Sequence, residues 1–432
     1  MMKRKMKAIT MLLLSMVLIL VISGCGGGSD SSSGSGEGDA NKQVTLDFMW
    51  FTDGIEGEVI KGLIKDYEKQ NANVKINLIE VPYKDLNTKL KTMIAGGQPP
   101  ALARMTDTGA YANQALDLAP YVGTADEFSG QFIDSIKAYY VSDGKIIAAP
   151  MDVTANGLIY NKTLFDKAGV QVPTDPNNVW TWDEFKAALK QVMEKGGAKY
   201  GLVWDVSPHR WSTMLYQFGG HMISEDGTKS AINSPEAAQA LDYFVGLHKE
   251  EIAPYSVWLG GENPNNLFRS GTVAAHLAGN WMLSSYKDIS NFEWGVTYMP
   301  KEKIRSSVPG GKHLMAFQGS KVEKEAADFI KWATSKEINS RYNQESLFIS
   351  PRKDSSDLDY AFGKEMFKVF ADELANTTPL AANDWSRQTI IPKFSTDLKD
   401  DIVQVLAEKM TAKEALENTA KLIDEAIAKD KD

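Results

Sequence analysis

The side chains of this chain whose types could do chemistry are mainly aromatic: its 432 residues include ten tryptophans, fifteen tyrosines and seventeen phenylalanines. A flat aromatic ring can pack against the apolar C–H face of a sugar ring, while carboxylates, amides and arginines exchange hydrogen bonds with its hydroxyls. A cleft with aromatic walls and a few fixed polar groups suits small ligands in general. The positions of these aromatic residues therefore matter more than their number, because only rings that the fold gathers in one place could form such a cleft.

Patterns typical of metal sites and of covalent catalysis are absent from the sequence. The five histidines form no i,i+4 pair and have no cysteine companion, so no metal-site spacing occurs. The sequence also contains no Gly-x-Ser-x-Gly elbow and no Walker motif. We therefore expect no cofactor, no metal and no enzymatic activity. A secreted carbohydrate-active enzyme stays an alternative, because a glycosidase needs two facing carboxylates and the chain has 56 acidic residues.

The first 25 residues predict export and lipid anchoring. Four basic side chains in residues 3–7 precede an uncharged apolar stretch from Met11 to Ile22. This stretch is too short for a permanent spanning helix, which needs about 20 residues, but it is typical of a signal peptide. Ile22-Ser23-Gly24-Cys25 then resembles the bacterial lipobox. This implies that residues 1–24 are removed and that Cys25, the single cysteine, carries acyl chains such as palmitate. An ordinary signal peptide with an incidental cysteine is the alternative.

The next segment predicts a tether. Gly26–Ala40 contains eleven Gly or Ser residues in fifteen positions and has almost nothing to bury. Such a segment is a flexible coil with a mean span of roughly 20 Å. We expect the folded part to stand off the extracytoplasmic face of the cell membrane, held by acyl chains rather than by a spanning helix.

Length, composition and charge limit the possible domain organisation and partners of the rest of the chain. About 390 residues follow the tether, more than one core usually serves, so two domains are expected. Hydrophobic residues at 43% and charged residues at 24% are ordinary for a soluble globular protein. The net charge of −9 argues against nucleic acid or anionic lipid as a partner, since both require a basic face.

Hydrophobic periodicity predicts an α/β architecture. Apolar residues alternate in 44–50 and again in 74–78, which is typical of strands, while Glu56–Gln70 and Tyr83–Ala95 have helical stripes. The order strand, helix, strand, helix implies parallel strands with crossover helices. Further helices are expected from Thr181, where Thr181 and Glu184 form a capping box, from Ser234-Pro235, and over Lys321–Trp332.

Short motifs then occur in a characteristic order. They are Tyr83–Tyr121, Gly144–Phe165, Trp182–Phe185, Gln217–Gly220, Phe268–Trp281, Gly310-Gly311, Lys324–Trp332 and Ser350-Pro351. Together these segments resemble the bacterial extracellular solute-binding proteins of family 1, the group that contains maltose-binding protein. The resemblance extends from Val44 to about Lys421. One departure is Pro99-Pro100-Ala101, where many members have Pro-Asp after the Gly-Gly turn, so the contacts of that loop are expected to differ.

The resemblance implies a two-lobed periplasmic-binding-protein-like fold. Each lobe is expected to be a mostly parallel sheet flanked by helices. Lobe 1 would comprise residues 41–151 plus 308–350, and lobe 2 residues 152–307 plus 351–432. Three hinge crossings are expected near residues 150–154, 308–311 and 350–352. A ligand that touches both lobes in the cleft between them stabilises the closed form.

The resemblance, together with the loop positions of the aromatic residues, suggests eleven ligand-binding candidates. They are Trp50, Tyr83, Asp107, Thr154, Asn156, His209, Arg210, Trp211, Trp258, Trp281 and Trp385. Trp281 matches a position where family members often place a stacking tryptophan. Residues 209–211 occupy a loop that lines the family's cleft. Trp50 ends the first strand, where a crevice forms at the carboxyl ends of parallel strands. For each aromatic candidate, a purely structural role in a lobe is the competing interpretation.

The function that the resemblance implies is that of a lipid-anchored solute-binding component of an ABC importer. It would capture a mono- or oligosaccharide, act as a monomer and deliver the sugar to membrane permease subunits. A binding protein for glycerol phosphate or another phosphorylated polyol is an alternative, with Arg210 and Arg269 as donors to the phosphate. A second alternative is a surface sensor, in which closure of the lobes is detected by a partner other than a permease.

Overall fold

The structure is a computed structural model that describes residues 43–52, 54–387 and 389–430. These described residues belong to one compact unit. The predicted signal peptide, the lipidated Cys25 and the Gly/Ser tether lie outside the described residues. Within the described part of the chain, no helix has both the length and the apolar character needed to cross a membrane.

The first sheet has five strands in the order β2-β1-β3-β11-β6. Their bounds are β1 Val44–Trp50, β2 Val74–Glu80, β3 Leu102–Met105, β6 Ala149–Thr154 and β11 Gly310–Ala316. β1 runs parallel to β2 and β3, whereas β11 runs antiparallel to β3 and β6. The parallel part is the one that the alternating apolar residues predict.

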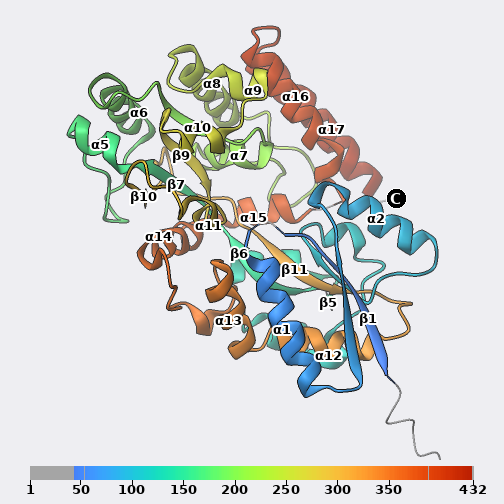
Figure 1. The fold of residues 1–432 in the computed structure, drawn as a ribbon. Coiled ribbons are helices and arrows are strands. Elements are labelled where there is room, and N and C mark those ends of the chain that lie inside the picture. The colour runs from blue at the N-terminus through green and yellow to red at the C-terminus, as the bar shows by residue number, and fades with distance from the viewer. Residues whose placement is uncertain (1–42, 53, 388, 431–432) are drawn as a thin grey trace, which may run out of the picture. The chain divides into compact units, whose positions relative to one another are not determined.

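Helices connect and cover the first sheet. α1 (Glu56–Gln70) and α2 (Tyr83–Ala95) have the bounds predicted from the sequence and provide the crossovers between parallel strands. α12 (Glu323–Ala333) packs on β11, and α13 (Lys336–Ser346) packs on α1. In Figure 1, α1 and α12 lie beside this sheet.

The second sheet has four strands in the order β10-β7-β9-β8. Their bounds are β7 Asn156–Asn161, β8 Tyr200–Trp204, β9 Val273–Gly279 and β10 Trp294–Thr297. β8 and β9 are parallel neighbours, while β7 is antiparallel to both β9 and β10. Each sheet thus contains one reversed strand, β11 in the first sheet and β7 in the second, and its other strands all run in one direction. The sheets are therefore mixed, with most strands running the same way, as predicted.

Most other helices surround the second sheet, as Figure 1 shows for α5 to α10. The further α-helices are α3 Ala119–Val122, α4 Ala125–Ser129, α5 Lys162–Ala168, α6 Trp182–Gln191, α7 Pro208–Gln217, α8 Pro235–Lys249, α9 Tyr255–Gly260, α10 Pro264–Arg269, α11 Met282–Tyr286, α14 Lys364–Ala375, α15 Pro379–Ser386, α16 Ser395–Leu406 and α17 Ala412–Asp430. The shorter elements are η1 Gly109–Tyr111, η2 Asp134–Tyr139, η3 Val192–Gly196, η4 Lys353–Ser355, η5 Ile391–Lys393, β4 Val141–Ser142 and β5 Lys145–Ile146.

Two sequence-predicted helix starts are confirmed by their hydrogen bonds. Thr181 accepts from the Glu184 amide, and the Glu184 carboxylate accepts from the Thr181 amide at 2.7 Å, which completes the capping box. Ser234 accepts from the Ala237 amide at the start of α8.

The chain passes more than once between the two sheets. It leaves the first sheet at Ala155 and returns between β10 and β11. After α13 it passes on to α14, which packs on β7 and β10 of the second sheet. The lobe boundaries given above stay a prediction.

Candidate ligand-binding cleft

A cavity of about 500 Å³ brings together residues that follow strands of both sheets. It is lined by Phe51, Tyr83, Thr106, Asp107, Tyr139, Thr154, Ser207, His209, Arg210, Trp281, Gly310, Gly311, Lys312, Trp385, Ile391 and Ser395. Seven of the eleven sequence-predicted candidates are in this set: Tyr83, Asp107, Thr154, His209, Arg210, Trp281 and Trp385. This volume lies within the range of small-molecule sites.

One wall comes from the carboxyl ends of β1 and β3. Because these strands are parallel neighbours, the residues after them meet at the same edge of the sheet. The rings of Phe51 and Tyr83 pack 4.9 Å apart, and Tyr83 is 55% exposed. The Asp107 carboxylate accepts hydrogen bonds from Asn87 Nδ2 at 2.8 Å and from Thr106 Oγ1 at 3.1 Å. This wall thus presents an aromatic surface beside a fixed carboxylate.

The opposite wall comes from α7 and from the end of β9. The Arg210 guanidinium lies 4.4 Å from the centre of the Trp281 ring. On the Gly279 side, a Cβ added to this glycine would come within 1.6 Å of Trp281 Cζ3, so the indole rests directly on the backbone there. Trp281 therefore contacts both the Gly279 backbone and the Arg210 guanidinium.

His209 is neutral in this arrangement. Arg210 Nη1 lies 2.6 Å from His209 Nδ1, and a guanidinium can only donate, so Nδ1 accepts and the ring proton is on Nε2. Burial, followed by the positive charge of Arg210, holds the pKa of His209 well below its usual value. Burial also lowers the pKa of Arg210, opposed by the Asp205 carboxylate, whose Oδ2 lies 3.6 Å from Arg210 Nε.

Trp385, on α15, extends this wall. Its Nε1 donates to Ser212 Oγ at 3.0 Å, and its ring packs 4.6 Å from the His209 ring. The preceding residue fixes the helix, because the Asp384 carboxylate accepts from the Tyr216 hydroxyl at 2.9 Å and from the Met222 amide at 2.7 Å. Burial raises the pKa of Asp384 to about 6.

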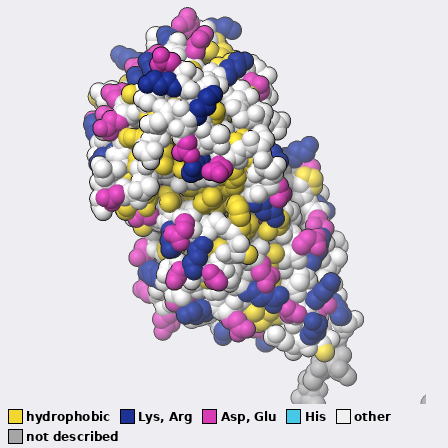
Figure 2. Space-filling model, turned by 60° about the vertical axis from the view of Figure 1, so that its left-hand side comes forward, with side chains coloured by type: hydrophobic (Ala, Val, Ile, Leu, Met, Phe, Trp, Pro, Cys, Tyr) yellow, Lys and Arg dark blue, Asp and Glu magenta, His cyan; other side chains and the backbone are white. Residues whose placement is uncertain are grey.

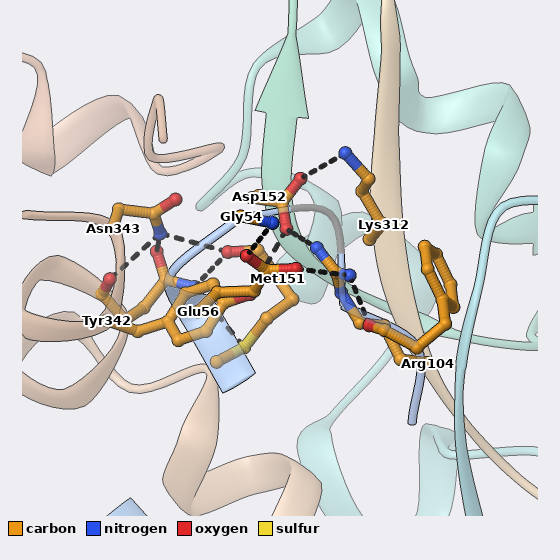
Figure 3. Close-up of polar contacts among 10 residues, drawn as sticks. Gly54, Glu56, Arg104, Met151, Asp152, Lys312, Tyr342 and Asn343 are labelled. Carbon is orange, nitrogen blue, oxygen red and sulfur yellow. Dashed lines mark hydrogen bonds and ion pairs between the residues drawn. The ribbon is translucent and has the colours of Figure 1, made fainter. Parts of the chain in front are cut away.

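A buried charge network lies beneath the cavity (Figure 3). Arg104, on β3, donates to Glu56 at 3.0 Å and to Asp152 at 3.4 Å, and all three side chains are fully buried. Lys312, on β11, lies with its Nζ 3.9 Å from Asp152 Oδ1 and itself lines the cavity. Two cations and two carboxylates balance, so the network ties β3, β6, β11 and the start of α1 together without a net charge.

Four sequence-predicted candidates do not line this cavity. Trp50 is fully buried and packs edge-on to Phe48 at 5.3 Å, because side chains alternate along β1 and Phe51, not Trp50, faces the cavity. Trp211 is fully buried, one position along α7 from Arg210.

The other two are likewise inside the second-sheet half of the molecule. Trp258 is 6% exposed and packs 5.2 Å from the Phe244 ring. Asn156 is 1% exposed, and its side-chain amide donates to Thr213 Oγ1 at 2.8 Å. Both side chains serve packing or hydrogen bonding between secondary-structure elements.

Sequence reasoning missed several lining residues. Among them are Phe51, Tyr139, Lys312 and Ile391. A usable signal existed for Phe51, since it directly follows a strand end that was singled out, and for Lys312, which follows the Gly310-Gly311 motif. Tyr139 and Ile391 lie in 3₁₀ segments without a periodic pattern.

The described residues include no group of three or more His, Cys, Asp or Glu side chains that could hold a metal ion. The arrangement is suited to stacking and hydrogen bonding with a small polar molecule.

Comparison with known proteins places this geometry in a family context. A profile described as "Bacterial extracellular solute-binding protein" matches residues 62–368. A binding protein of Brucella abortus (strain 2308) is 27% identical over 316 residues, which cover 70% of this chain and 75% of that protein. The sn-glycerol-3-phosphate-binding periplasmic protein UgpB of Rhizobium meliloti (strain 1021) is 23% identical over 418 residues, 89% of this chain and 95% of that protein.

Among solved structures, an ABC substrate-binding protein of Listeria monocytogenes in complex with cycloalternan is similar to this chain, with a TM-score of 0.76 and 24% identity. The match covers 90% of this chain and all of that chain (100%). This likeness confirms the two-lobed α/β fold predicted from the sequence.

Proposed function

Because the chain belongs to the bacterial extracellular solute-binding proteins, we propose that it is the ligand-capturing component of an ABC importer. It binds a mono- or oligosaccharide in the cleft and delivers it unchanged to membrane permease subunits. Cys25 anchors it by acyl chains to the extracytoplasmic face of the membrane, after removal of residues 1–24. It acts as a monomer, and its lobes, residues 41–151 plus 308–350 and residues 152–307 plus 351–432, close around the ligand.

The observation that carries this proposal is the pair of walls of the cavity. Phe51 and Tyr83 provide an aromatic surface on one side, and Trp281 and Trp385 provide aromatic rings on the other. Asp107 and Arg210 offer a carboxylate and a guanidinium between them. Rings for C–H faces and charged groups for hydroxyls are the combination that a sugar requires.

A phosphorylated polyol is the second candidate ligand. Two cations, Arg210 and Lys312, line the cavity, and the UgpB relative is named for glycerol-3-phosphate binding. Against it, Arg210 lies on Trp281, and Asp107 adds a negative charge to the same cavity. Arg269 is exposed and donates to the Ser285 carbonyl outside the cavity, so it does not assist Arg210.

A ligand panel tests the proposal. The mature protein is screened by thermal shift and tryptophan fluorescence against neutral mono- and oligosaccharides and against phosphorylated polyols. A sugar at 100 times its Kd adds roughly 2.7 kcal/mol to the free energy of unfolding. Stabilisation by phosphorylated polyols alone would replace the sugar assignment by the second candidate.

Two further measurements separate the remaining alternatives. Recovery of the bound sugar after incubation, intact by chromatography, argues against a carbohydrate-active enzyme, whereas new reducing ends would establish one. If a strain that lacks this chain does not take up the sugar, and wild-type protein restores uptake whereas a cleft variant does not, a sensor is excluded.

The lipid anchor is tested separately. Cys25→Ser should release the protein from the membrane fraction, and retention of this variant in that fraction would refute the lipid anchor.

A further inference from the structure

A second cavity, of about 450 Å³, lies away from the cleft. It is formed by η2, by the segment that joins α13 to α14, and by α14 itself, and it shares no lining residue with the first cavity. Figure 2 brings the left-hand side of Figure 1, where α14 is drawn, forward. Hydrophobic side chains gather at the middle of this face, between regions richer in charged side chains.

The interior of this cavity is apolar and rigidly built. The rings of Tyr360 and Phe367 stack with their centres 3.9 Å apart and nearly parallel, at 14°. The Tyr360 hydroxyl donates to the Phe348 carbonyl at 2.7 Å, so the polar end of this residue is already satisfied and its ring faces apolar neighbours. Ile349 and Leu374, which are 9% and 5% exposed, also line it, together with Ile133, Leu358, Ala371, Ala375 and the serines at 135, 350, 355 and 356.

The charged part of the cavity lining is cationic. Arg352, Lys353, Lys364 and Lys368 line it, against one carboxylate, Asp357. The closest carboxylate partners of these cations are Asp354 at 2.8 Å, Asp134 at 2.9 Å, Asp359 at 3.2 Å and Glu365 at 2.9 Å, and none of these four lines the cavity.

The two lysines of α14 are more exposed than Arg352, another cation of this lining. The Lys364 and Lys368 side chains are 39% and 58% exposed. Surface ion pairs of this kind contribute about 0–1 kcal/mol. An anion placed in the cavity mouth therefore competes with the present partners at small cost.

We propose that this second cavity is a binding site for a small amphiphile with an apolar, preferably aromatic, body and one acidic group. The body would fill the space beside Tyr360 and Phe367, and the acidic group would meet Lys364 and Lys368. The volume fits a small molecule, whereas a stable protein partner would have to bury at least about 1,200 Å² in total. This ligand is distinct from the sugar proposed above, and the site borders the predicted hinge crossing at residues 350–352, since Ser350 and Arg352 line the cavity.

A matched pair of fluorescent probes tests the proposal. 8-Anilinonaphthalene-1-sulfonate has an aromatic body and one sulfonate, and N-phenyl-1-naphthylamine has the same body without the charge. The mature protein should bind the sulfonate probe with a stoichiometry of one and roughly tenfold more tightly than the neutral probe, a difference of about 1.4 kcal/mol. Equal affinity for both probes, or no saturable binding, would overturn the proposal.

Variants locate the bound probe. Lys364→Gln with Lys368→Gln should weaken the sulfonate probe five- to tenfold and leave the neutral probe unchanged, because only charge is removed. Lys324→Gln with Lys331→Gln, two exposed lysines of α12, is the control for general charge loss. An equal effect of the two double variants would show that the probe responds to net charge rather than to this cavity.

Two further variants complete the test: one fills the second cavity, and the other alters the cleft. Ala371→Trp places an indole in the second cavity and should abolish binding of both probes, with circular dichroism to check that the variant folds. If it does not fold, the lysine pairs decide the outcome. Tyr83→Ala, in the exposed part of the cleft, should leave both probes bound. Loss of probe binding in Tyr83→Ala would place the probe in the cleft and refute the second site.

Discussion

The Arg210 guanidinium lies over the Trp281 ring, 4.4 Å from its centre, and the same ring lies close against the Gly279 backbone. The tryptophan expected to stack on ligand is thus covered by an arginine. A guanidinium on an indole face is a cation–π contact of about 0.5–2 kcal/mol. This wall therefore presents to the cavity both the Trp281 indole and the guanidinium that lies over it.

Arg210→Lys should weaken ligand binding about tenfold, which corresponds to about 1.4 kcal/mol. Lysine keeps the charge but has no planar group to lie on Trp281 and cannot donate in the same geometry to a ligand. The measurement is a tryptophan fluorescence titration with a ligand found in the panel. Arg269→Lys, an exposed arginine outside the cavity, is the matched control and should bind as the wild type does. Unchanged ligand affinity in Arg210→Lys would show that the Arg210 side chain does not contribute to ligand binding.

Gly279→Ala should impair binding by displacing Trp281. The new Cβ would come within 1.6 Å of the Trp281 ring, so the indole must leave its present position and Arg210 loses its platform. We expect a tenfold or greater loss of affinity together with a changed tryptophan emission spectrum. Gly246→Ala is the control, because a Cβ at this position of α8 meets nothing within 4 Å. It should bind normally and be as stable as the wild type or up to about 1 kcal/mol more stable.

The sequence predicted the elements of the fold well because their signals are local. The bounds of α1 and α2 followed from hydrophobic stripes, and the start of α6 from the capping box at Thr181. The mixed strand directions were not predictable in this way. The direction of β7 depends on how the chain turns at Ala155, and the direction of β11 depends on its return from the second sheet.

The site was predictable only to the level of loops. Residues 50 and 51 follow one another at the end of β1, but strand alternation sends Trp50 into the core and Phe51 into the cavity. Likewise Arg210 and Trp211 are neighbours on α7 that face different surroundings. A resemblance selects the loop, whereas the pleat and the helix turn select the side chain.

Arg104→Met should strongly destabilise the protein. It removes the guanidinium that both the Glu56 and the Asp152 carboxylates contact in the interior, which costs about 3–5 kcal/mol. The double variant Arg104→Met with Glu56→Gln should be less destabilised than the sum of its single variants, because the charge imbalance is smaller. Urea unfolding gives these free energies. Additivity within about 0.5 kcal/mol would show that Arg104 and Glu56 are not coupled.

The control for this cycle is an exposed ion pair on α1, the helix that carries Glu56. Lys61 lies 3.0 Å from Glu58, with its side chain 37% exposed. Lys61→Met should change the free energy of unfolding by less than about 1 kcal/mol. A larger loss would mean that methionine substitutions near α1 are harmful for reasons other than buried charge.

The stability of the wild type relative to Asp384→Asn should fall as the pH rises from about 4 to about 6. Burial raises the pKa of Asp384 to about 6 in the folded state, whereas an unfolded aspartate titrates near 3.9. The folded protein therefore retains a proton that the unfolded chain has lost. The favourable contribution of this proton to the free energy of unfolding is complete below the unfolded pKa and lost above about pH 6.

Asparagine cannot titrate, so the difference in the free energy of unfolding between the two proteins isolates this carboxyl group. Urea unfolding across this range should give a decrease of about 1–3 kcal/mol in that difference. A difference that stays constant, or that grows with pH, would show that Asp384 is already ionised in the folded protein, held by the amides of Met222 and Ile223.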